Sequence, residues 1–454
     1  MFTKLRITNF KSWADTGNVP LTPITGLFGT NSSGKTSILQ FLLALKQTVE
    51  STDRTQVFNL GDKRTIVDLG TFFDIIYEHN TNGSLSFDLE WKLQDPLHLE
   101  PSIYKKKIGK LHFNASIKQQ TTNELPGKLY VEDLGYNIPG ETFSIQLTHN
   151  NTGEGYELNA PHIQLKRQRG RAWDIPAPVR FYGFPDEIFA YYQNVSWLSE
   201  FALSIEKLFS RLYYLGPIRE YPGRSYSWSG EVPRDVDRRG EATVAALLAS
   251  RAKGKTITRG RGRGHKKQTV EERVAEWLKE MGLIYDFNLH QIAPNRKEYE
   301  LRIKITQESP EVLITDVGFG MAQILPVLVL CYYVPEGSIL LFEQPEIHLH
   351  PKVQYILADV FIDIAKTRNI QVILESHSEH ILQRFQRRAA EDPTLGNLMS
   401  FYFTHINNGQ SKIQNLILDE FGNIKNWPED FFGDEMGEVS ARLRAEMQRK
   451  NITS

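Results

Sequence analysis

The sequence predicts an α/β protein: a mixed sheet with flanking helices, interrupted by an inserted region that is helical and basic. Two observations carry this prediction. The apolar run ITGLF (24–28) has the pattern of a buried strand and leads, through a short loop, into the helical pattern SILQFLLALKQTV (37–49). Further along, the segments MAQILPVLVLCYY, SILLFE, PKVQYILADVFIDIA and IQVILES alternate between helix and buried strand. Such alternation is typical of βα units and a parallel sheet.

The elements follow in order along the chain. Short strands are predicted near 5–7, 84–91, 110–117, 128–131 and 143–147, because β-favouring runs alternate there with Gly, Asn and Pro. A helical pattern runs from about 187 to 212 and ends in the turn-rich stretch YYLGPIREYPGR. An amphipathic helix is predicted at about 269–282, followed by two strands within 283–306.

Residues 249–268 differ in composition from the rest of the chain. Eight Lys or Arg residues stand there with interspersed glycines and no acidic residue. Glycine and uncompensated charge both oppose a packed core, so we expect an exposed loop or linker. Two interpretations stay open: the loop contacts DNA phosphates, or it is simply a solvated charge run.

Composition excludes several classes. The chain has 454 residues, 53 Lys and Arg against 54 Asp and Glu, and 40% hydrophobic residues, which is ordinary for a globular protein. Its one cysteine, Cys331, lies in an apolar run and fits a reducing compartment. The longest apolar stretch, 324–334, is about half of the roughly 20 residues that a membrane span needs. We therefore expect a soluble, cytoplasmic protein with no membrane partner.

A nucleotide-binding motif follows the first buried strand. GTNSSGKT (29–36) fits G-x-x-x-x-G-K-[ST] and opens a helix, which favours a P-loop over a glycine-rich turn. Backbone N–H groups of such a loop surround phosphate oxygens, Lys35 brings a cation to the β- and γ-phosphates, and Thr36 reaches Mg²⁺. The predicted ATP-binding residues here are Gly29, Asn31, Ser32, Ser33, Gly34, Lys35, Thr36 and Ser37.

Three further motifs stand in a definite order. DVGFGMAQ (316–323) opens a helix with Gly318 and Gly320, the place of a signature motif. SILLFE then ends a strand at Glu343, the layout of a Walker B carboxylate that holds Mg²⁺ through water, and Gln344 follows it. His377 comes later, where a switch histidine would contact the γ-phosphate. This is the order of ABC-type ATPases.

The distance of about 300 residues between the P-loop and Glu343 indicates an ATPase head interrupted by a large insertion. We predict four parts. These are an N-terminal part of the head with a β-rich lobe (1–215), an inserted helical region with the basic loop (216–300), a C-terminal part of the head (301–410) and a tail (411–454).

A metal site is the alternative explanation for the histidines. His348, His350, His377 and His380, together with Glu346, have spacings that can chelate zinc. The ABC motif order accounts for these residues without a metal cluster, and we prefer it.

Together the motifs resemble a known family. NFKSW, GTNSSGKT, VDLGTFFDII, YYLGPIREYPGRSY, DVGFGMAQILPVL, LFEQPEIHLHP, ESHSEHIL and NWPEDFF resemble bacterial ABC-type ATPases of the overcoming-lysogenization and RecF-like branch. Within that branch, the chain is most similar to the ATPase subunits of Septu-type anti-phage defence, which work with an HNH endonuclease. The resemblance implies ATP and Mg²⁺ as cofactors and an HNH subunit as partner. It also implies at least a homodimer, in which Gly318 and Gly320 approach the γ-phosphate held by the other subunit.

Two residues depart from the family pattern. The signature segment carries Ala322 and lacks the usual serine, and Gln344 replaces the usual second glutamate. An amide can orient water but cannot accept its proton, and a general base typically contributes a factor of about 10²–10⁴. We therefore expect slow hydrolysis at a catalytic set of Glu343, Gln344 and His377, unless Glu346 or a partner residue serves as base.

The 77 residues after His377 bear on whether the chain cuts DNA itself. A nuclease module of the kind appended in related enzymes needs on the order of 100 residues and several acidic metal ligands, so we expect none in this chain. The last predicted helix presents Val439, Leu443 and Met447 as a narrow docking stripe. Three functions remain open: a regulatory ATPase of a separate nuclease, a DNA-repair ATPase that binds DNA directly, and a scaffold with structural nucleotide.

Overall fold

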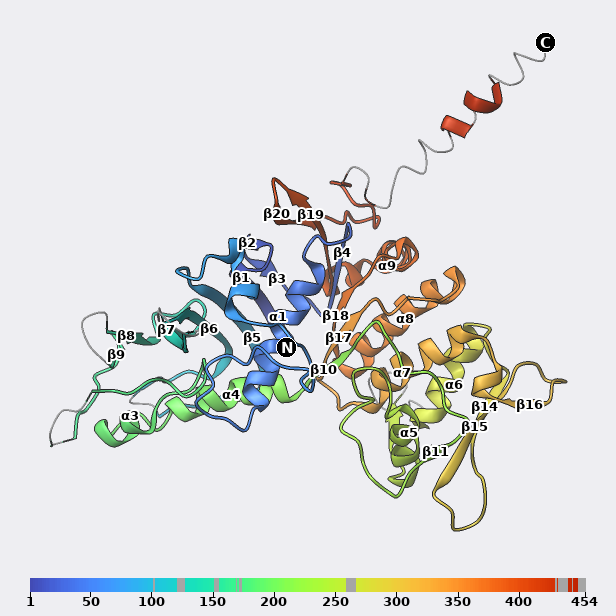
Figure 1. Ribbon diagram of the computed structural model, residues 1–454, viewed down its shortest axis with the longest axis horizontal. Coiled ribbons are helices and arrows are strands. Elements are labelled where there is room, and N and C mark those ends of the chain that lie inside the picture. Colours follow the sequence, from blue (N-terminus) through green and yellow to red (C-terminus); the bar gives the residue numbers. More distant parts are fainter. Residues whose placement is uncertain are drawn as a thin grey trace.

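The computed structural model describes residues 1–100, 103–120, 127–150, 155–168, 170, 174–258, 267–428, 431, 440–442 and 444–447. Two lobes flank a central sheet (Figure 1). No helix in the described ranges is both long and apolar enough to cross a membrane.

An eight-stranded antiparallel sheet forms the N-terminal lobe, in the order β2-β1-β5-β6-β7-β8-β9 with β3 paired to β1. Its strands are β1 (Phe2–Phe10), β2 (Trp13–Asp15), β3 (Val19–Pro20), β5 (Leu85–Leu97), β6 (Ile108–Gln119), β7 (Leu129–Asn137), β8 (Ser144–His149) and β9 (Tyr156–Asn159). These strands confirm the short β runs predicted for the N-terminal third.

A six-stranded sheet joins distant parts of the chain, in the order β10-β17-β18-β4-β19-β20. Its strands are β4 (Ile24–Gly29), β10 (Leu212–Leu215), β17 (Ile339–Glu343), β18 (Gln371–Glu375), β19 (Met399–Asn407) and β20 (Gln410–Leu416). The first five strands in this order are parallel and only β20 is antiparallel. β4 and β18 are buried throughout, as expected for parallel strands covered on both faces. The predicted mixed sheet is confirmed.

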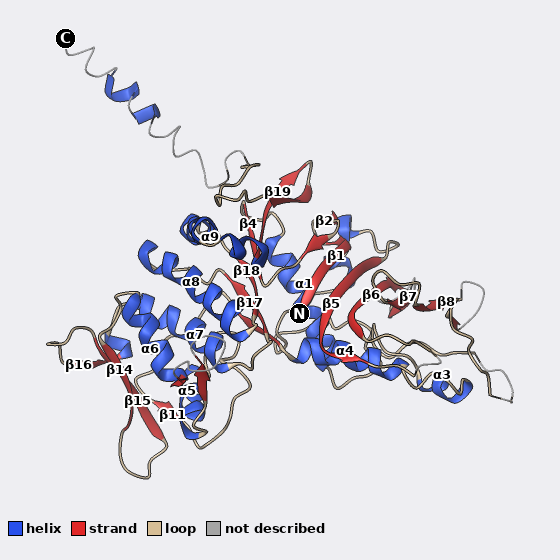
Figure 2. Ribbon diagram, turned by 180° about the vertical axis from the view of Figure 1, so that it is seen from behind, coloured by secondary structure: helices blue, strands red, loops and turns tan. Residues whose placement is uncertain are grey.

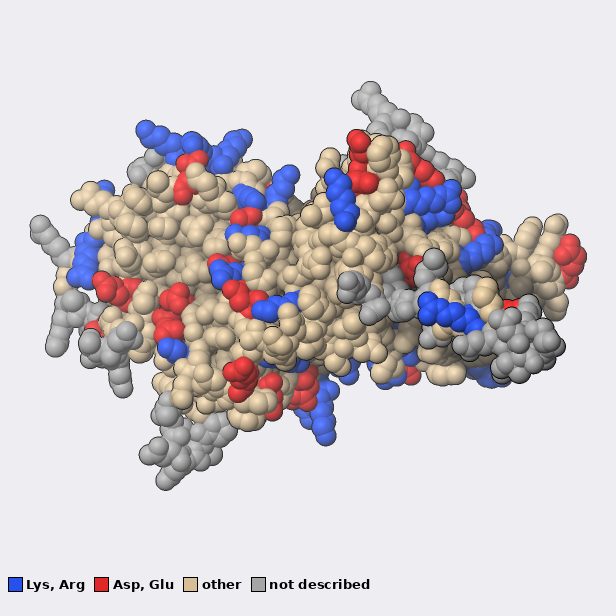
Figure 3. Space-filling view, turned by 90° about the horizontal axis from the view of Figure 1, so that it is seen from above, with Lys and Arg blue, Asp and Glu red and all other residues tan. Residues whose placement is uncertain are grey.

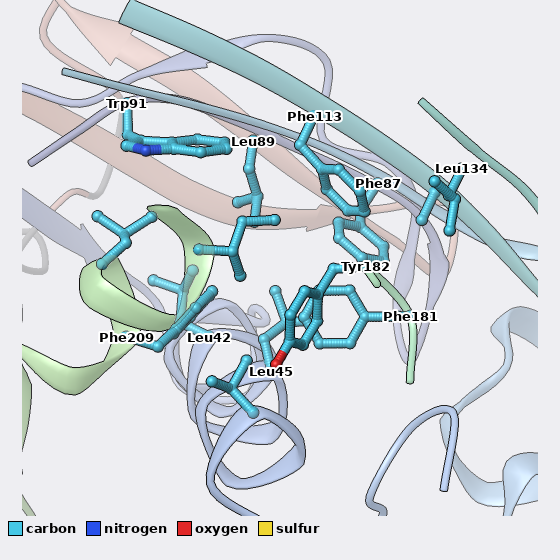
Figure 4. Close-up of a cluster of buried hydrophobic side chains, with 14 of the residues drawn as sticks. Leu42, Leu45, Phe87, Leu89, Trp91, Phe113, Leu134, Phe181, Tyr182 and Phe209 are labelled. Carbon is cyan, nitrogen blue, oxygen red and sulfur yellow. The ribbon is translucent and has the colours of Figure 1, made fainter. Parts of the chain in front are cut away.

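Helix α1 lies between the two sheets. Leu42 and Leu45 of α1 face Phe87 of β5 and Phe113 of β6, while Phe209 approaches from α4 (Figure 4). Burying large aromatic side chains such as these stabilises the lobe. The lobe therefore holds the helix that begins at the P-loop in a fixed position.

Further helices pack on the other side of the central sheet and around the lobe (Figure 2). The helices are α1 (Lys35–Glu50), α2 (Phe72–Ile75), α3 (Asp186–Tyr191), α4 (Leu198–Ser210), α5 (Thr243–Ala252), α6 (Val270–Glu280), α7 (Phe319–Tyr333), α8 (Pro351–Arg368) and α9 (Glu379–Glu391), with 3-10 turns at Tyr77–His79, Ile314–Asp316 and Pro393–Leu398. The remaining short strands are β11 (Tyr226–Ser227), β12 (Thr256–Thr258), β13 (Lys267–Thr269), β14 (Asp286–Gln291), β15 (Glu298–Lys304) and β16 (Glu311–Leu313).

The basic segment 249–268 is not a loop throughout. Its start belongs to α5, and β12 and β13 form an antiparallel pair. Ile257 of β12 is buried in the core, and Arg251 pairs with Glu271 at 2.7 Å, so this part of the chain has both an apolar anchor and a counter-charge. The prediction of an exposed loop or linker is wrong for these ends, and residues 259–266 lie outside the described ranges.

Two other predictions need correction or restriction. The helical pattern at 187–212 is divided into α3 and α4, because Tyr192 is extended and Trp197 donates a hydrogen bond to the carbonyl of Asn194. In the tail, 440–442 and 444–447 are helical and Met447 is exposed. Val439 and Leu443, the other members of the predicted docking stripe, lie outside the described residues.

Candidate functional site

The P-loop joins β4 to α1 and requires glycine at both ends. Gly34, at the N-terminus of α1, has φ of 91°, and Gly29 has φ of 140°. A Cβ atom on Gly29 would lie 2.1 Å from the carbonyl oxygen of Thr404, because β19 runs directly beside β4. The loop can take this curled shape only because neither position carries a side chain.

A cleft of about 340 Å³ opens over the P-loop. It is lined by Ser12, Asn31, Ser32, Ser33, Gly34, Lys35, Thr36, Ser37, Gln344, Glu375 and His377. The structure therefore brings Gln344 and His377, predicted from distant motifs, to the same cleft as the P-loop. Backbone N–H groups at the start of α1 and the partial positive charge of the helix terminus favour an anion in such a cleft.

Lys35 and Ser33 differ in what their side chains face. Lys35 Nζ donates to the carbonyls of Gly29 (3.1 Å) and Thr30 (2.7 Å), across the curve of the loop. Burial lowers the pKa of Lys35, and the carboxylates of Glu375 and Glu346 oppose that shift. The Ser33 hydroxyl is buried and lies 2.6 Å from that of Thr404, so any contact of Ser33 with a phosphate would use its backbone N–H.

Two carboxylates stand at adjacent strand ends. Glu343 of β17 and Glu375 of β18 are partners in the parallel register. The Thr36 hydroxyl donates to Glu375 Oε1 at 3.0 Å, and burial raises the pKa of Glu375 to about 7. Glu343 instead accepts a hydrogen bond from the Tyr214 hydroxyl at 2.7 Å, and burial also raises its pKa. Glu343 is thus one strand further from the P-loop than Glu375.

Gln344 is held by its backbone. Its φ of 45° is uncommon for a residue with a side chain. Its N–H donates to the carbonyl of Glu375 at 2.9 Å, and its own carbonyl accepts from Arg219 Nη1 at 3.3 Å. Arg219 is buried, and burial lowers its pKa to about 10 against the attraction of Glu346 and nearby groups. These contacts leave the Gln344 side chain on the cleft.

Glu346 supports the histidine loop and lies behind the cleft lining. Its Oε1 accepts the His377 backbone N–H at 2.8 Å, and the side chain is buried. Burial and the charge of Lys35 lower the pKa of His377, so its ring is neutral at neutral pH. Glu346, although described, is not one of the residues that line the cleft. As a substitute base it is therefore poorly placed in this conformation.

The histidines of the proposed zinc site do not gather. His348 packs against Phe319, His350 accepts a hydrogen bond at the start of α8, and His380 lies 3.2 Å from the Tyr355 hydroxyl. Within the described ranges, no three His, Cys, Asp or Glu side chains are placed to hold a metal ion. The zinc alternative is wrong for this part of the chain.

The predicted signature segment lies elsewhere on the surface. Gly318 is exposed at the N-terminus of α7, and Gly320 follows in its first turn. Neither glycine, both of them described residues, belongs to the cleft lining. A Cβ atom on Gly318 would meet no atom within 4 Å. The structure therefore does not bring the predicted signature segment to the P-loop cleft of the same chain.

Several site residues were not predicted from the sequence. Glu375 begins the motif ESHS but was not singled out, Ser12 stands in NFKSW, and Tyr214 and Arg219 stand in YYLGPIREYPGR. The available signal was Glu375 itself, a carboxylate at the end of a second buried parallel strand. Neighbouring parallel strands bring their carboxyl ends to the same edge of a sheet, which is where ligands bind in open α/β folds.

A P-loop cleft at the carboxyl ends of parallel strands, lined also by Gln344 after β17 and His377 after β18, is the arrangement of a nucleotide-binding ATPase head. The chain belongs to the AAA ATPase domain family, whose model matches residues 1–167 and 263–382. A model of a protein family of unknown function (DUF3696) matches residues 399–441. ATPases of this family type bind nucleotide, typically with Mg²⁺.

Solved structures of SMC heads are similar to the chain. One is an SMC head bound to the C-terminal winged-helix domain of ScpA, at 12% identity and a TM-score of 0.46, covering 92% of this chain and 98% of that chain. Another is the SMC head domain from Thermotoga maritima, at 10% identity and a TM-score of 0.41, covering 92% and 99%. A third, derived from Pyrococcus furiosus, is a head with an extended coiled coil bound to the C-terminal domain of ScpA, at 11% identity and a TM-score of 0.43, covering 98% and 99%. A comparison with curated proteins found no match.

Proposed function

We propose that the protein binds ATP with Mg²⁺ in the P-loop cleft, dimerises around the nucleotide and hydrolyses it slowly. The observation that carries this proposal is the composition of the cleft: P-loop residues, Gln344 and His377 share one lining. Exposed Gly318 and half-buried Gly320, at the start of α7, lie outside that lining. The proposal retains the four-part division of the chain at residues 215, 300 and 410.

Each residue has a distinct part in binding. The N–H groups of the loop bind phosphate oxygens, and Lys35 neutralises the β- and γ-phosphates. The residues present fit Mg²⁺, because the Thr36 hydroxyl and the nearby carboxylates are the hard oxygen donors that this ion prefers. Thr36 would hold it directly and Glu343 through water, and the ion would neutralise charge on the phosphates. His377, neutral and on the cleft, can donate a hydrogen bond to the γ-phosphate.

Slow turnover follows from Gln344. Its side-chain carbonyl can orient an attacking water but cannot take the proton that this water must lose. The sequence suggests Glu346 as a substitute base, but its carboxylate accepts a hydrogen bond from the His377 backbone N–H. ATP would then act chiefly to hold two subunits together.

Self-association would complete the site. In a dimer of this type, Gly318 and Gly320 of the partner subunit would approach the γ-phosphate held by Lys35. The exposure of Gly318 and the open space around its Cα position support this arrangement. The N-terminus of α7 would then add a partial positive charge from the second subunit.

The family resemblance extends the proposal to a partner. We propose that the ATP-bound state controls a separate HNH endonuclease subunit in anti-phage defence. DNA contact through 249–268 is a further part of the proposal, supported by its Lys and Arg content. On the face shown in Figure 3, Lys and Arg are interspersed with Asp and Glu. That face therefore offers no broad basic surface in support of DNA contact. Co-purification with the HNH subunit, with and without ATP, tests the partnership.

The direct test of the proposed function is nucleotide binding. Lys35→Ala removes the cation from the phosphates, and we expect the ATP affinity to fall at least about 100-fold, since a desolvated charge–phosphate contact is worth about 3 kcal/mol. Isothermal titration calorimetry measures this, and circular dichroism checks the fold. Lys63→Ala, the same change at an exposed lysine, is the control and should bind as the wild type does. Equal affinities for all three proteins would disprove the P-loop assignment.

A further inference from the structure

The hydroxyl of Thr36 and the carboxylate of Glu375 form an oxygen pair at the mouth of the P-loop. Thr36 Oγ1 lies 3.0 Å from Glu375 Oε1, and both residues line the 340 Å³ cleft. Thr36 is the P-loop position whose hydroxyl reaches Mg²⁺. A carboxylate that touches this hydroxyl lies within one hydrogen bond of the position that a P-loop metal ion takes.

The second oxygen of Glu375 has no assigned contact. Glu375 is 2% exposed, and its Oε2 is buried without a hydrogen-bond partner among the described residues. A buried carboxylate oxygen left unpaired costs free energy, and a bound ion is one partner that would offset this cost. Lys35 lies close enough for its charge to act on Glu375, yet its Nζ donates to two backbone carbonyls.

Glu343, the carboxylate that the sequence pattern assigns to the ion, is engaged elsewhere. Its Oε2 accepts from the Tyr214 hydroxyl at 2.7 Å, and the charge of buried Arg219 acts on it as well. Glu343, although described, is not part of the cleft lining, whereas Glu375 is. Of the two adjacent strand-end carboxylates, only Glu375 faces the P-loop.

The backbone fixes Glu375 in this place. β18 lies between β17 and β4, and Glu375 is the register partner of Leu27, two residues before the loop begins. The next residue, Ser376, donates its N–H to the carbonyl of Leu27 at 3.0 Å. On the other side, the Gln344 N–H donates a hydrogen bond to the Glu375 carbonyl. The backbone of Glu375 is thus fixed between β17 and β4, and a carboxylate that starts from a fixed backbone can serve as a preorganised ligand.

We propose that Glu375 supplies the carboxylate that binds the divalent cation with Thr36, while Glu343 has a secondary part. The proposal deepens, and rests on, the proposed function as an ATP-binding head. Mg²⁺ is usually held by one or two carboxylates together with substrate phosphates and waters, so a single well-placed glutamate is sufficient. This assignment gives the ESHS motif a metal-binding role in addition to its histidine.

The test measures how strongly a divalent cation assists nucleotide binding. The affinity for the non-hydrolysable β,γ-imido analogue of ATP is measured by calorimetry with Mn²⁺ and again in EDTA, and the ratio of the two gives the contribution of the metal. We expect Glu375→Gln to reduce this ratio at least tenfold and to leave the affinity in EDTA within about threefold of the wild type. Glu343→Gln should reduce the ratio by less. Glu336→Gln, at the opposite end of the same sheet, is the matched control and should leave the ratio unchanged.

The outcomes separate the two proposals. If wild-type protein binds no nucleotide under either condition, the proposed function fails. If it binds, and Glu343→Gln reduces the ratio as much as or more than Glu375→Gln, the assignment of the metal to Glu375 is overturned. If Glu375→Gln fails to fold, Glu375→Asp is measured in its place. Glu375→Asp keeps the negative charge on a side chain that is shorter by one methylene group. The same tenfold criterion applies to it.

Discussion

The P-loop and the start of α7 are both glycine-containing helix N-termini, but the surroundings of their glycines differ. At the P-loop, Gly29 is enclosed by β19, and the surrounding residues form a cleft. At α7, Gly318 is exposed and has open space where a side chain would begin. Glycine at the first place is required by the fold of this chain. Glycine at the second place is not required by the fold, which leaves it open to contact with a partner subunit as proposed above.

The largest effect is expected when the enclosed glycine is changed. Gly29→Ala places a methyl group about where the Thr404 carbonyl lies, at a backbone conformation that side chains avoid, and should cost roughly 3–5 kcal/mol of folding free energy. We expect a melting temperature lower by at least about 6–10 °C in scanning fluorimetry. Gly318→Ala is the paired control and should melt as the wild type does. Equal melting temperatures for the two variants would remove the contrast between the regions.

The next effect concerns association. Gly318→Glu adds a carboxylate at a site that would face a partner's phosphates, so ATP-dependent dimerisation should weaken by about 10–100-fold, or about 1.4–2.8 kcal/mol. Light scattering with ATP and Mg²⁺ measures the dimer, and calorimetry checks that each subunit still binds ATP. Loss of ATP binding together with the dimer would mean that α7 acts within its own subunit.

A smaller gain is expected on the P-loop side. Gln344→Glu supplies a proton acceptor at a residue that already lines the cleft, and turnover should rise about tenfold or more. A phosphate-release assay measures it, with Gln344→Ala as the control that lacks both functions of the amide. Fast turnover in the wild type, with no gain in the glutamate variant, would show that another group is the base.

The smallest effect is one of pH on stability. Burial raises the pKa of Glu375 from an ordinary 4.5 to about 7, so the native state binds a proton that the unfolded state releases between these values. Stability from this residue is therefore greatest below about pH 4.5 and decreases as the pH rises to about 7. In nucleotide-free protein, the melting temperature of Glu375→Gln relative to wild type should increase by a few degrees between pH 5 and pH 8. A constant difference would mean that Glu375 is not buried on the P-loop side in solution.

The P-loop itself could be predicted because its information is local. The residues from Gly29 to Thr36 are contiguous, and their chemistry follows from their spacing. Enclosure of Gly29 by Thr404 could not be predicted, since the strand pairing between β4 and β19 joins residues 375 positions apart. Periodicity identifies each strand but does not give its neighbours.

The same limit leaves contacts at the site unpredicted and explains the error in the basic segment. Glu343 was assigned to the metal ion from its place in a motif, but the motif does not reveal that Tyr214 donates to it or that Glu375 lies nearer Thr36. In the basic segment, composition predicted exposure, while burial of Ile257 depended on a core assembled from other helices. Composition averages over a segment and therefore misses a single anchoring residue.

The position of β4 has a consequence for biosynthesis. The strand that carries the P-loop is paired on one side with β18 and on the other with β19, both of which are translated long after it. At roughly 5–20 residues per second, the 375 residues between Gly29 and Thr404 take about 20–75 seconds to synthesise. For most of that interval, the N-terminal lobe can fold while the P-loop strand has neither neighbour, and β18 becomes available shortly before β19. A nascent or truncated chain that stops before β19 would accordingly be unable to hold nucleotide, and only subunits translated beyond this strand could enter an ATP-dependent assembly.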